Sequence, residues 1–324
     1  MRLLDKVLGY SFLDMKINEN VALAPLTTFG IGGAAKYLVD VRSDDEIREA
    51  IQWAKDRGVR FVVLASGSNV LILDEGLEAL VIRLKGNLLN VSGSTVDSWA
   101  GTNLLELIRS LGVQGYGGWE KLAGIPGTIG GAVRGNAGAF GSEIKDFVTK
   151  VRALHSGTGE VREFANDDCD FSYRHSFFKD NPEWIITRVI ITLQTIEPAQ
   201  SDRLAKETIA EREKRHLQNV KAAGSFFMNP VAPPEVVEMF EKEKGVKARE
   251  GRVPAGWLIE KAGMKGVVVG GACASEQHPN YIVNTGTATA KDVLALAAKI
   301  KDAVRQKFSV ELHEEAAVFP SLTE

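Results

Sequence analysis

Lys121–Gly141, which reads KLAGIPGTIGGAVRGNAGAFG, is the stretch that decides the fold, and glycine recurs through it every few positions around Asn136. Because glycine has no Cβ atom, the N–H groups of such a backbone can converge on an anion such as a pyrophosphate. A second stretch, Ala65–Asn69 (ASGSN), directly follows the apolar run Phe61–Leu64. Two such loops at strand ends are what a dinucleotide needs, whereas ordinary turns would explain only the shorter loop well.

The composition is that of an ordinary globular protein: 324 residues, 44% apolar and 25% charged, with a net charge of −3. This length suffices for two or three domains. The weakly acidic balance argues against nonspecific nucleic-acid binding, and no apolar run approaches membrane-spanning length. Acidic residues interrupt Met1–Asp14, so we do not expect a signal peptide there. These features predict a cytoplasmic enzyme with neither nucleic-acid nor membrane partners.

Metal sites and a Rossmann-type site are not expected. The two cysteines, Cys169 and Cys273, are far apart, and the five histidines are scattered without an i, i+4 pair. The chain also lacks a Walker A loop and a G-x-G-x-x-G fingerprint. A dinucleotide bound here would therefore be held without the Rossmann fingerprint.

The hydrophobic periodicity predicts an α/β chain with a strand-rich middle. Ser43–Arg57 gives the clearest signal, since Ser43 and Glu46 can form a capping box and Gly58 can end the helix. Further helices are expected at Thr102–Leu111, Arg203–Arg215, Pro234–Lys244, Pro254–Ala262 and Ala290–Phe308. Strands are expected at Phe61–Leu64, Ala79–Leu84, Val148–Leu154, Glu160–Phe164, Trp184–Leu193, Val267–Val269 and Tyr281–Asn284.

Three residues outside the glycine loops could carry chemistry. Arg174 lies in the aromatic-rich FSYRHSFFK, where a guanidinium could bind a carboxylate or phosphate at two points. Ser225 in AAGSFFMNP could donate a proton, and Glu315 in ELHEEAAVF could act as a general acid. Each also has an ordinary explanation: a surface ion pair, a turn-capping serine, and a solvated acidic face. Taken singly, none of the three outweighs that explanation.

A set of motifs, taken together, resembles the UDP-N-acetylenolpyruvoylglucosamine reductase (MurB) family. The motifs follow the family's order from about Leu23 to Val318: TTFGIGGAA, ASGSNVLI, LAGIPGTIGGAVRGNAGAFG, YRHSFFK, AGSFFMNP, PAGWLIEKAGMKG and the closing LHEE. The AGIPGTIGG…NAG run and GSFFxNP are specific signals. The short spacing from Arg174 to Ser225 leaves no room for an extra tyrosine-bearing loop, so the chain resembles the shorter, type II-like subclass.

The resemblance implies an α/β (α+β) protein, with an FAD-binding fold of the vanillyl-alcohol-oxidase (PCMH) type in two subdomains and an α/β substrate-binding domain. The expected division is 1–82 for the first subdomain, with 309–324 returning near it, 83–215 for the second, and 216–308 for the substrate-binding domain. FAD, bound tightly and non-covalently, would be held by Ser66, Gly67, Ser68, Asn69, Val70, Gly124, Ile125, Pro126, Gly127, Gly130, Gly131, Asn136, Ala137 and Gly138.

The resemblance also implies the reaction: NADPH-dependent reduction of the enolpyruvyl group of UDP-N-acetylglucosamine enolpyruvate to UDP-N-acetylmuramate, in peptidoglycan precursor synthesis. Arg174 would stabilise developing negative charge, Glu315 in its acid form would polarise the substrate carboxylate, and Ser225 would protonate the α-carbon. Residues that would bind the UDP-sugar are Asn229, Lys265 and His278. No metal is implied, and we expect a monomer.

Several positions depart from the family pattern. Ala65-Ser66 stands where Gly-Gly is usual, and Met228 replaces the common lysine of GSFFKNP. Arg134 lies where apolar residues are more usual. The closing motif offers two acids, and the register counted from Leu312 favours Glu315 over the preceding residue.

Two other functions stay open on the sequence. One is a different flavoprotein of the same superfamily, such as an alcohol or hydroxy-acid oxidase, which GSFFxNP and Glu315 disfavour. The other is a nucleotide-sugar-binding homologue without activity, supported by Ala65-Ser66 and Met228 and opposed by the three candidate catalytic residues. Oxygen consumption with small alcohols would favour the first, and a colourless protein that takes up no FAD would favour the second.

Overall fold

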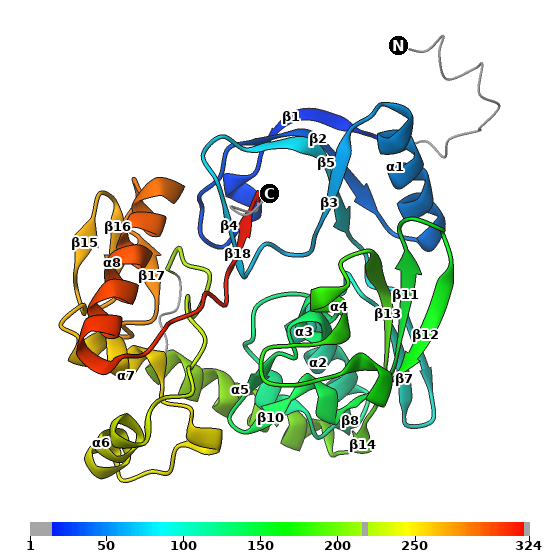
Figure 1. The fold of residues 1–324 in the computed structure, drawn as a ribbon. Helices are drawn as coiled ribbons and strands as arrows, with labels where there is room; N and C mark the ends of the chain where they lie inside the picture. Colours follow the sequence, from blue (N-terminus) through cyan, green and yellow to red (C-terminus); the bar gives the residue numbers. More distant parts are fainter. Residues whose placement is uncertain (1–14, 216–219, 321–324) are drawn as a thin grey trace.

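A computed structural model describes residues 15–215 and 220–320 of the chain (Figure 1). Met1–Asp14, where no signal peptide is expected, lies outside the described residues. The last four residues of the segment 309–324 also lie outside them. The described residues contain three larger sheets, which have four, five and three strands in chain order. Among the described helices, none is long and apolar enough to cross a membrane.

The first sheet has the strand order β1-β2-β5-β3, formed by Asn18–Ala22, Ala34–Val41, Leu77–Leu84 and Arg60–Leu64. β2 and β3 both run parallel to β5, and helix α1 (Asp44–Asp56) connects β2 to β3. The Oγ atom of Ser43 accepts the N–H of Glu46 at 3.1 Å, and the chain leaves the helix at Gly58 with φ +62°. The predicted helix and its ends are confirmed, but the capping box is incomplete because the Glu46 carboxylate accepts the N–H of Arg42, at 2.6 Å, and not that of Ser43.

The second sheet is antiparallel throughout, in the order β12-β11-β13-β7-β6. Its strands are Val161–Ala165, Val148–His155, Trp184–Thr192, Thr95–Trp99 and Leu89–Ser92. Helices α2 (Leu104–Val113) and α5 (Pro198–Arg215) pack against each other. The small sheet of β8 (Tyr116–Gly117) and β14 (Gln194–Thr195) lies close to both helices. The strands and helices predicted for this part of the chain are present, with ends that differ by a few residues.

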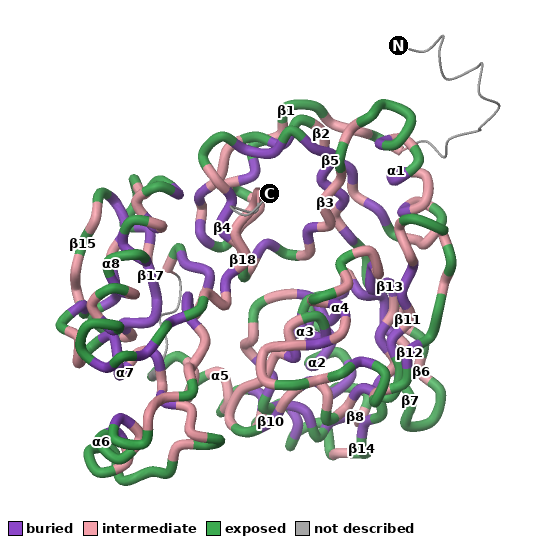
Figure 2. Tube along the Cα trace, viewed as in Figure 1, coloured by how far each residue is buried: buried purple, intermediate pink, exposed green. Residues whose placement is uncertain are grey.

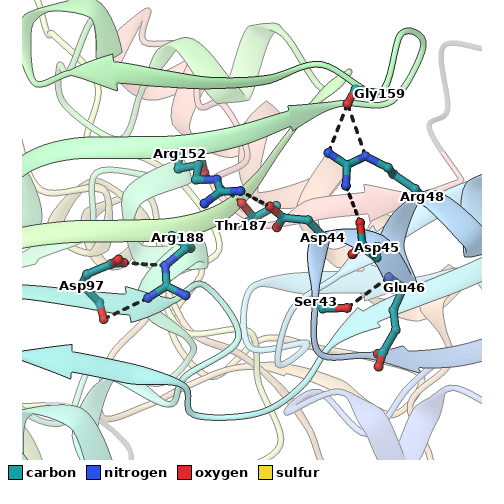
Figure 3. Close-up of polar contacts among 10 residues, drawn as sticks. All are labelled: Ser43, Asp44, Asp45, Glu46, Arg48, Asp97, Arg152, Gly159, Thr187 and Arg188. Atoms are coloured by element: carbon teal, nitrogen blue, oxygen red, sulfur yellow. Dashed lines mark hydrogen bonds and ion pairs between the residues drawn. The ribbon is translucent and has the colours of Figure 1, made fainter.

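Helix α1 joins the first sheet to the second (Figure 3). Nη2 of Arg152 on β11 is 2.7 Å from Oδ2 of Asp44, and Arg48 donates two hydrogen bonds of 3.3 Å to the carbonyl of Gly159. Beneath these bonds the two sheets share one hydrophobic core, which includes Val39, Ile47, Leu80, Trp99, Leu107, Phe164 and Phe178. We call this the shared core.

The third region, drawn on the left in Figures 1 and 2, packs around a second core that also takes in Phe29, Ile31 and Leu71 from the first-sheet side. Its elements are α6 (Pro234–Lys244), α7 (Ala255–Lys261), β15 (Val268–Val269), β16 (Ala272–Ala274), β17 (Ile282–Asn284) and α8 (Ala290–Phe308). Its core includes Phe226, Phe227, Phe240, Trp257, Ile282 and Leu296. Helices α6 and α8 have the predicted bounds, whereas Pro254 is the N-cap of α7 and not its first residue.

The chain returns from the third region to the first sheet. Strand β18 (Ala317–Phe319) pairs in parallel with β4 (Val70–Ile72), next to the predicted cofactor loop. At the other end of the region, the Thr28 hydroxyl donates a 2.7 Å hydrogen bond to the carbonyl of Ala222. The division into 1–82, 83–215 and 216–308 stays a prediction, and the three sheets are grouped along similar bounds.

The glycine-rich run contains a short helix that the sequence pattern did not predict, α3 (Ile129–Arg134). Thr128 caps it by accepting the N–H of Gly131 at 3.2 Å. A Cβ atom on Gly130 would lie 2.7 Å from the Cβ of Ala100, so only glycine lets this helix pack so closely. Glycine is a poor helix former, which is why the run looked like a loop. Short elements nearby are β9 (Gly138–Ala139), β10 (Ser142–Glu143) and α4 (Phe177–Asp180).

Candidate active site

The structure brings the two predicted cofactor loops into contact. The Ser68 hydroxyl donates to the carbonyl of Pro126 at 3.2 Å and lies 3.3 Å from the hydroxyl of Ser66. Gly127 has φ +130°, and a Cβ atom there would lie 3.1 Å from Oγ of Ser68. A Cβ on Gly67 would meet the carbonyl of Leu26 at 2.2 Å. The glycines therefore allow two backbone loops and two hydroxyl groups to form one polar cradle.

Asn136, another predicted cofactor residue, is fully buried. Its Nδ2 donates to the carbonyl of Ser172 at 2.9 Å and to Glu143 at 3.1 Å, and its Oδ1 accepts the N–H of Lys145 at 3.3 Å. Its amide thus supports the turn that carries Arg174. Direct contact between Asn136 and a cofactor stays a prediction.

Arg174 lies in a tight turn in which Ser172 and His175 form an isolated β-bridge. Its backbone has φ +58°, a left-handed conformation that costs a non-glycine residue of order 1–3 kcal/mol. The Lys179 ammonium donates to the Arg174 carbonyl at 3.0 Å, and Nη2 of Arg174 donates to the carbonyl of Gly138 at 3.4 Å. The surrounding bonds therefore hold a strained residue in place, a pattern typical of functional sites.

Glu315 forms an ion pair with Arg174, with 2.7 Å between Oε1 and Nε. The side chains are 18% and 23% exposed. The Glu315 N–H donates to the carbonyl of Phe226 at 2.8 Å, and Nδ2 of Asn69 donates to the Glu315 carbonyl at 3.1 Å. Burial raises the pKa of Glu315, although the positive charges of Arg174 and Lys179 oppose the rise. The acid form is therefore more accessible than in a free glutamate.

The neighbouring acid does not share this position. The Glu314 carboxylate is paired with Lys301, with Oε1 and Nζ 3.0 Å apart. The structure thus supports the register that assigns the site to Glu315.

Ser225, the third candidate, follows Gly224, which has φ +74°, and is half-buried. The next residue, Phe226, donates its N–H to the carbonyl of Asn280 at 2.7 Å and accepts the N–H of Glu315. Ser225 is therefore one residue away from Phe226, whose carbonyl is bonded to the N–H of Glu315. Arg174, Ser225 and Glu315 come together although they are far apart in the sequence.

Asn229 reaches the same neighbourhood from the substrate-binding side. Its N–H donates to the hydroxyl of Tyr173 at 3.3 Å, and Tyr173 directly precedes Arg174 in the chain. Its Oδ1 accepts the N–H of Ala255 at 3.0 Å at the start of α7. One acceptor of this amide is therefore already used within the protein.

The other two predicted substrate residues are placed differently. The His278 ring packs edge-on against the ring of Tyr281 with 4.8 Å between centroids, and burial lowers the pKa of His278, so the imidazole is neutral at pH 7. Lys265 is exposed and paired with Glu260 at 3.1 Å. The contacts of Lys265 do not extend to Arg174 or Glu315, and its role stays a prediction.

The structure adds basic residues that sequence reasoning missed. Burial, together with repulsion from Arg134 and Arg174, lowers the pKa of Lys179, while Glu315 opposes the change. Burial also lowers the pKa of Arg212 on α5, whose Cδ lies 3.1 Å from where a Cβ on Gly124 would be. Lys179 could have been found from its place in YRHSFFK. Arg212 could not, since it lies in a charged helix with no other signal. Among the described residues, no cluster of three or more histidine, cysteine or acidic side chains could hold a metal ion.

Comparison with known proteins covers almost the whole chain. Residues 215–319 match the family described as "UDP-N-acetylenolpyruvoylglucosamine reductase, C-terminal domain", and residues 35–165 match the family described as "FAD binding domain". A UDP-N-acetylenolpyruvoylglucosamine reductase of Solibacter usitatus is 34% identical over 93% of this chain and 96% of its own length. One from Bacillus subtilis is 34% identical over 94% of each chain.

A solved structure agrees with these relatives. The crystal structure of UDP-N-acetylenolpyruvylglucosamine reductase (MurB) from Thermus caldophilus has a TM-score of 0.74 to this chain at 34% identity. The match covers 94% of this chain and 100% of that one. The predicted fold class is confirmed by this likeness and by the FAD-binding match.

Proposed function

Because the chain belongs to the UDP-N-acetylenolpyruvoylglucosamine reductase family, we propose that Arg174, Ser225 and Glu315 carry out the family's reaction here. The protein is an FAD-dependent oxidoreductase that uses NADPH to reduce UDP-N-acetylglucosamine enolpyruvate to UDP-N-acetylmuramate, for peptidoglycan precursor synthesis. The observation that carries the residue assignment is the Arg174–Glu315 ion pair of 2.7 Å, next to the Ser225 segment and close to both glycine loops.

The cradle of the two loops fits FAD. The hydroxyls of Ser66 and Ser68 and the loop around Gly127 offer donors and close backbone approach where a pyrophosphate would need them. When bound, FAD supplies hydride transfer between NADPH and the sugar nucleotide. The protein supplies binding, orientation and electrostatics.

Arg174 provides the positive charge that the reaction requires. Reduction of the enolpyruvyl group at its β-carbon places negative charge on the α-carbon and the adjacent carboxylate. A guanidinium that is already held by Gly138 and Glu315, on a backbone whose carbonyl accepts a hydrogen bond from Lys179, stabilises this charge without having to reorganise. Glu315 in its acid form donates a hydrogen bond to the substrate carboxylate, and its raised pKa favours that form.

Ser225 donates the proton that the α-carbon receives. The hydroxyl lies on a segment fixed by the bonds from Phe226 to Asn280 and from Glu315 to Phe226. A serine is a weak acid, so this role requires a neighbouring charge or a water molecule to make the loss of its proton less costly.

The remaining assignments are also proposals. They are the division into 1–82, 83–215 and 216–308, binding of the UDP-sugar by Asn229, Lys265 and His278, a monomeric state and a cytoplasmic location. The sheet grouping supports the first, and the Asn229–Tyr173 hydrogen bond supports the second in part.

Anaerobic stopped-flow absorbance of the purified protein tests the function. NADPH should bleach the flavin, and UDP-N-acetylglucosamine enolpyruvate should restore it without oxygen. Bleaching without recovery would leave a flavoprotein with another substrate, and oxygen consumption with small alcohols would then identify an oxidase. A protein that takes up no flavin would favour the nucleotide-sugar-binding alternative.

A further inference from the structure

A cavity of about 610 Å³ continues the active site along the third region. Phe226 is bonded to Glu315, and two residues farther on the Met228 N–H donates to the carbonyl of His313 at 2.9 Å. Met228 and His313 both line the cavity, together with Tyr173, Asn229 and Arg252. Two residues of extended chain, as from Phe226 to Met228, span about 7 Å. The cavity therefore begins about one sugar ring away from the proposed catalytic pair, Arg174 and Glu315.

Arg252, whose side chain is 32% exposed, is a half-buried cation that lines this cavity and has an unused donor. Its Nη1 donates to the carbonyl of Asn229 at 3.1 Å, and its Cζ lies 4.5 Å from the centroid of the Tyr173 ring. Its Nε is buried and has no hydrogen-bond partner in the described part of the chain. The nearest acid is Glu250, 3.7 Å from Nε, and its side chain is 81% exposed. This weak, solvated pairing leaves most of the guanidinium charge available.

The backbone around Arg252 is fixed before any ligand arrives. Arg252 forms an antiparallel bridge with Val231, and the Val253 N–H donates to the carbonyl of Pro230 at 3.0 Å. The preceding Gly251 turns the chain with φ +68°. A guanidinium held in this way pays little conformational entropy when it binds an anion.

Other charges at the cavity do not neutralise Arg252. Glu311 also lines it, but its carboxylate is ion-paired with Arg305 on α8. Tyr173 connects the cavity to the catalytic pair, because its ring faces Arg252 on one hand and lies 5.1 Å from Cζ of Arg174 on the other. The cavity thus presents the Arg252 guanidinium beside the active site, and the Glu311 carboxylate in its lining is already paired with Arg305.

On the basis of the proposed function, we propose that Arg252 binds a phosphate group of the nucleotide that occupies this cavity. Both NADPH and the UDP-sugar carry a diphosphate, and a guanidinium fork matches the geometry of phosphate oxygens. Arg252 touches no reacting atom, so it acts in binding and leaves the chemical step to Arg174, Ser225 and Glu315.

Arg252→Gln tests this assignment in the full-length, FAD-loaded protein. Loss of a charge-assisted bond should weaken nucleotide binding by about ten- to a hundredfold, with the rate at saturation retained. The two half-reactions identify the source of the phosphate. If the apparent Kd rises only in flavin recovery, the phosphate belongs to the UDP-sugar. If it rises only in flavin bleaching, the phosphate belongs to NADPH. If it rises in both half-reactions, the two nucleotides share one phosphate subsite.

A second substitution separates binding from a structural role. Met228 lines the same cavity, so Met228→Lys added to Arg252→Gln should return a cation and recover most of the lost affinity. Lys247→Gln, which removes an exposed charge nearby, should leave both half-reactions unchanged. Unchanged affinity in Arg252→Gln would overturn the proposal. So would a loss of flavin content and melting temperature that Met228→Lys does not repair.

Titration with UDP alone keeps this test independent of the overall reaction. UDP should bind the wild-type protein and bind Arg252→Gln about tenfold more weakly or worse. If flavin recovery fails in the wild type while UDP still distinguishes the two proteins, the proposed function fails and the phosphate site stands. If UDP binds both equally, the phosphate site fails on its own.

Discussion

The first two sheets and the third region are built in different ways. The four- and five-stranded sheets share one hydrophobic core, and Arg152–Asp44 and Arg48–Gly159 bonds tie them together. The core around Phe240 and Trp257 in the third region also includes Phe29, Ile31 and Leu71 from the first-sheet side. The comparison teaches that segments on the first-sheet side contribute to both cores, including one that directly follows the Ser66–Val70 cofactor loop.

The proposed catalytic residues lie where these two units meet. Arg174 is carried by a turn of the second-sheet region, whereas Ser225 and Glu315 lie at the two ends of the third region. The ion pair between Arg174 and Glu315 therefore crosses from one unit to the other. Each prediction below asks whether the two units behave separately or together.

The largest effects should come from truncating a large buried side chain in each core. Phe164→Ala in the shared core and Phe240→Ala in the third region should each cost about 3–5 kcal/mol of stability. Because the second cofactor loop packs against the shared core through Ile125 and Ala137, Phe164→Ala should also release FAD. Phe240→Ala should keep a flavin that NADPH still bleaches, and should lose flavin recovery by the sugar nucleotide. Thermal melting and flavin fluorescence measure both results.

Equal loss of flavin in the two variants would contradict this expectation. It would mean that the two cores unfold as one cooperative unit. Val237→Ala, on the same helix as Phe240 but only partly buried, serves as the control and should be nearly neutral.

Ser225→Ala should slow the sugar half-reaction by about a hundred- to a thousandfold, because a positioned proton donor contributes this much. Flavin bleaching by NADPH should be nearly unchanged, since no proton from Ser225 is needed there. Stopped-flow traces of the two half-reactions provide the measurement. Equal losses in both halves would rule out the role as proton donor.

Arg174→Lys should slow the same half-reaction by about a hundredfold. An ammonium keeps the charge but cannot keep both the Glu315 and Gly138 contacts of the planar guanidinium. The rate at saturating sugar nucleotide should fall more than the affinity. A pure loss of affinity would show that Arg174 binds the substrate without stabilising the transition state.

Glu315→Gln should give the smallest effect, which is a change in how the melting temperature depends on pH. The fold raises the pKa of Glu315, so its stabilising contribution is complete below the unfolded value of about 4.3 and is lost as pH rises through the folded value. Glutamine stays neutral, so the melting temperature of the variant minus that of the wild type should increase from pH 5 to pH 8. A constant or falling difference would contradict the raised pKa.

Elements whose ends are encoded locally could be predicted from the sequence. Helix α1 has its Ser43 cap, and α8 has a capping box in which Thr289 and Asp292 bond each other's backbone. The three proposed catalytic residues were also singled out, but only because a family resemblance brought them together, and their roles stay predictions. Their own sequence neighbourhoods favoured ordinary explanations.

Features that depend on tertiary packing could not be predicted. Helix α3 exists because Gly130 packs onto Ala100, and the left-handed turn at Arg174 exists because Asn136 and Lys179 hold it. The stacking of Arg252 on Tyr173 joins two segments with no shared pattern. Such contacts are decided by the assembled fold.

The return of the chain at β18 limits how the third region can move. Its two chain crossings to the rest of the protein lie near the same place, one at Ala222–Ser225 and the other at Glu315–Ala317. Hydrogen bonds from the start of α8 to Asp74 and from Asn284 to the carbonyl of Phe29 also tie the region to the first-sheet side. Two crossings define an axis, and a rotation about that axis displaces the most distant residues, such as those of α6, the most. Ser225 and Glu315 lie on the axis itself. Opening and closing of the sugar-binding surface would therefore leave the proton donor and the acid nearly stationary beside Arg174.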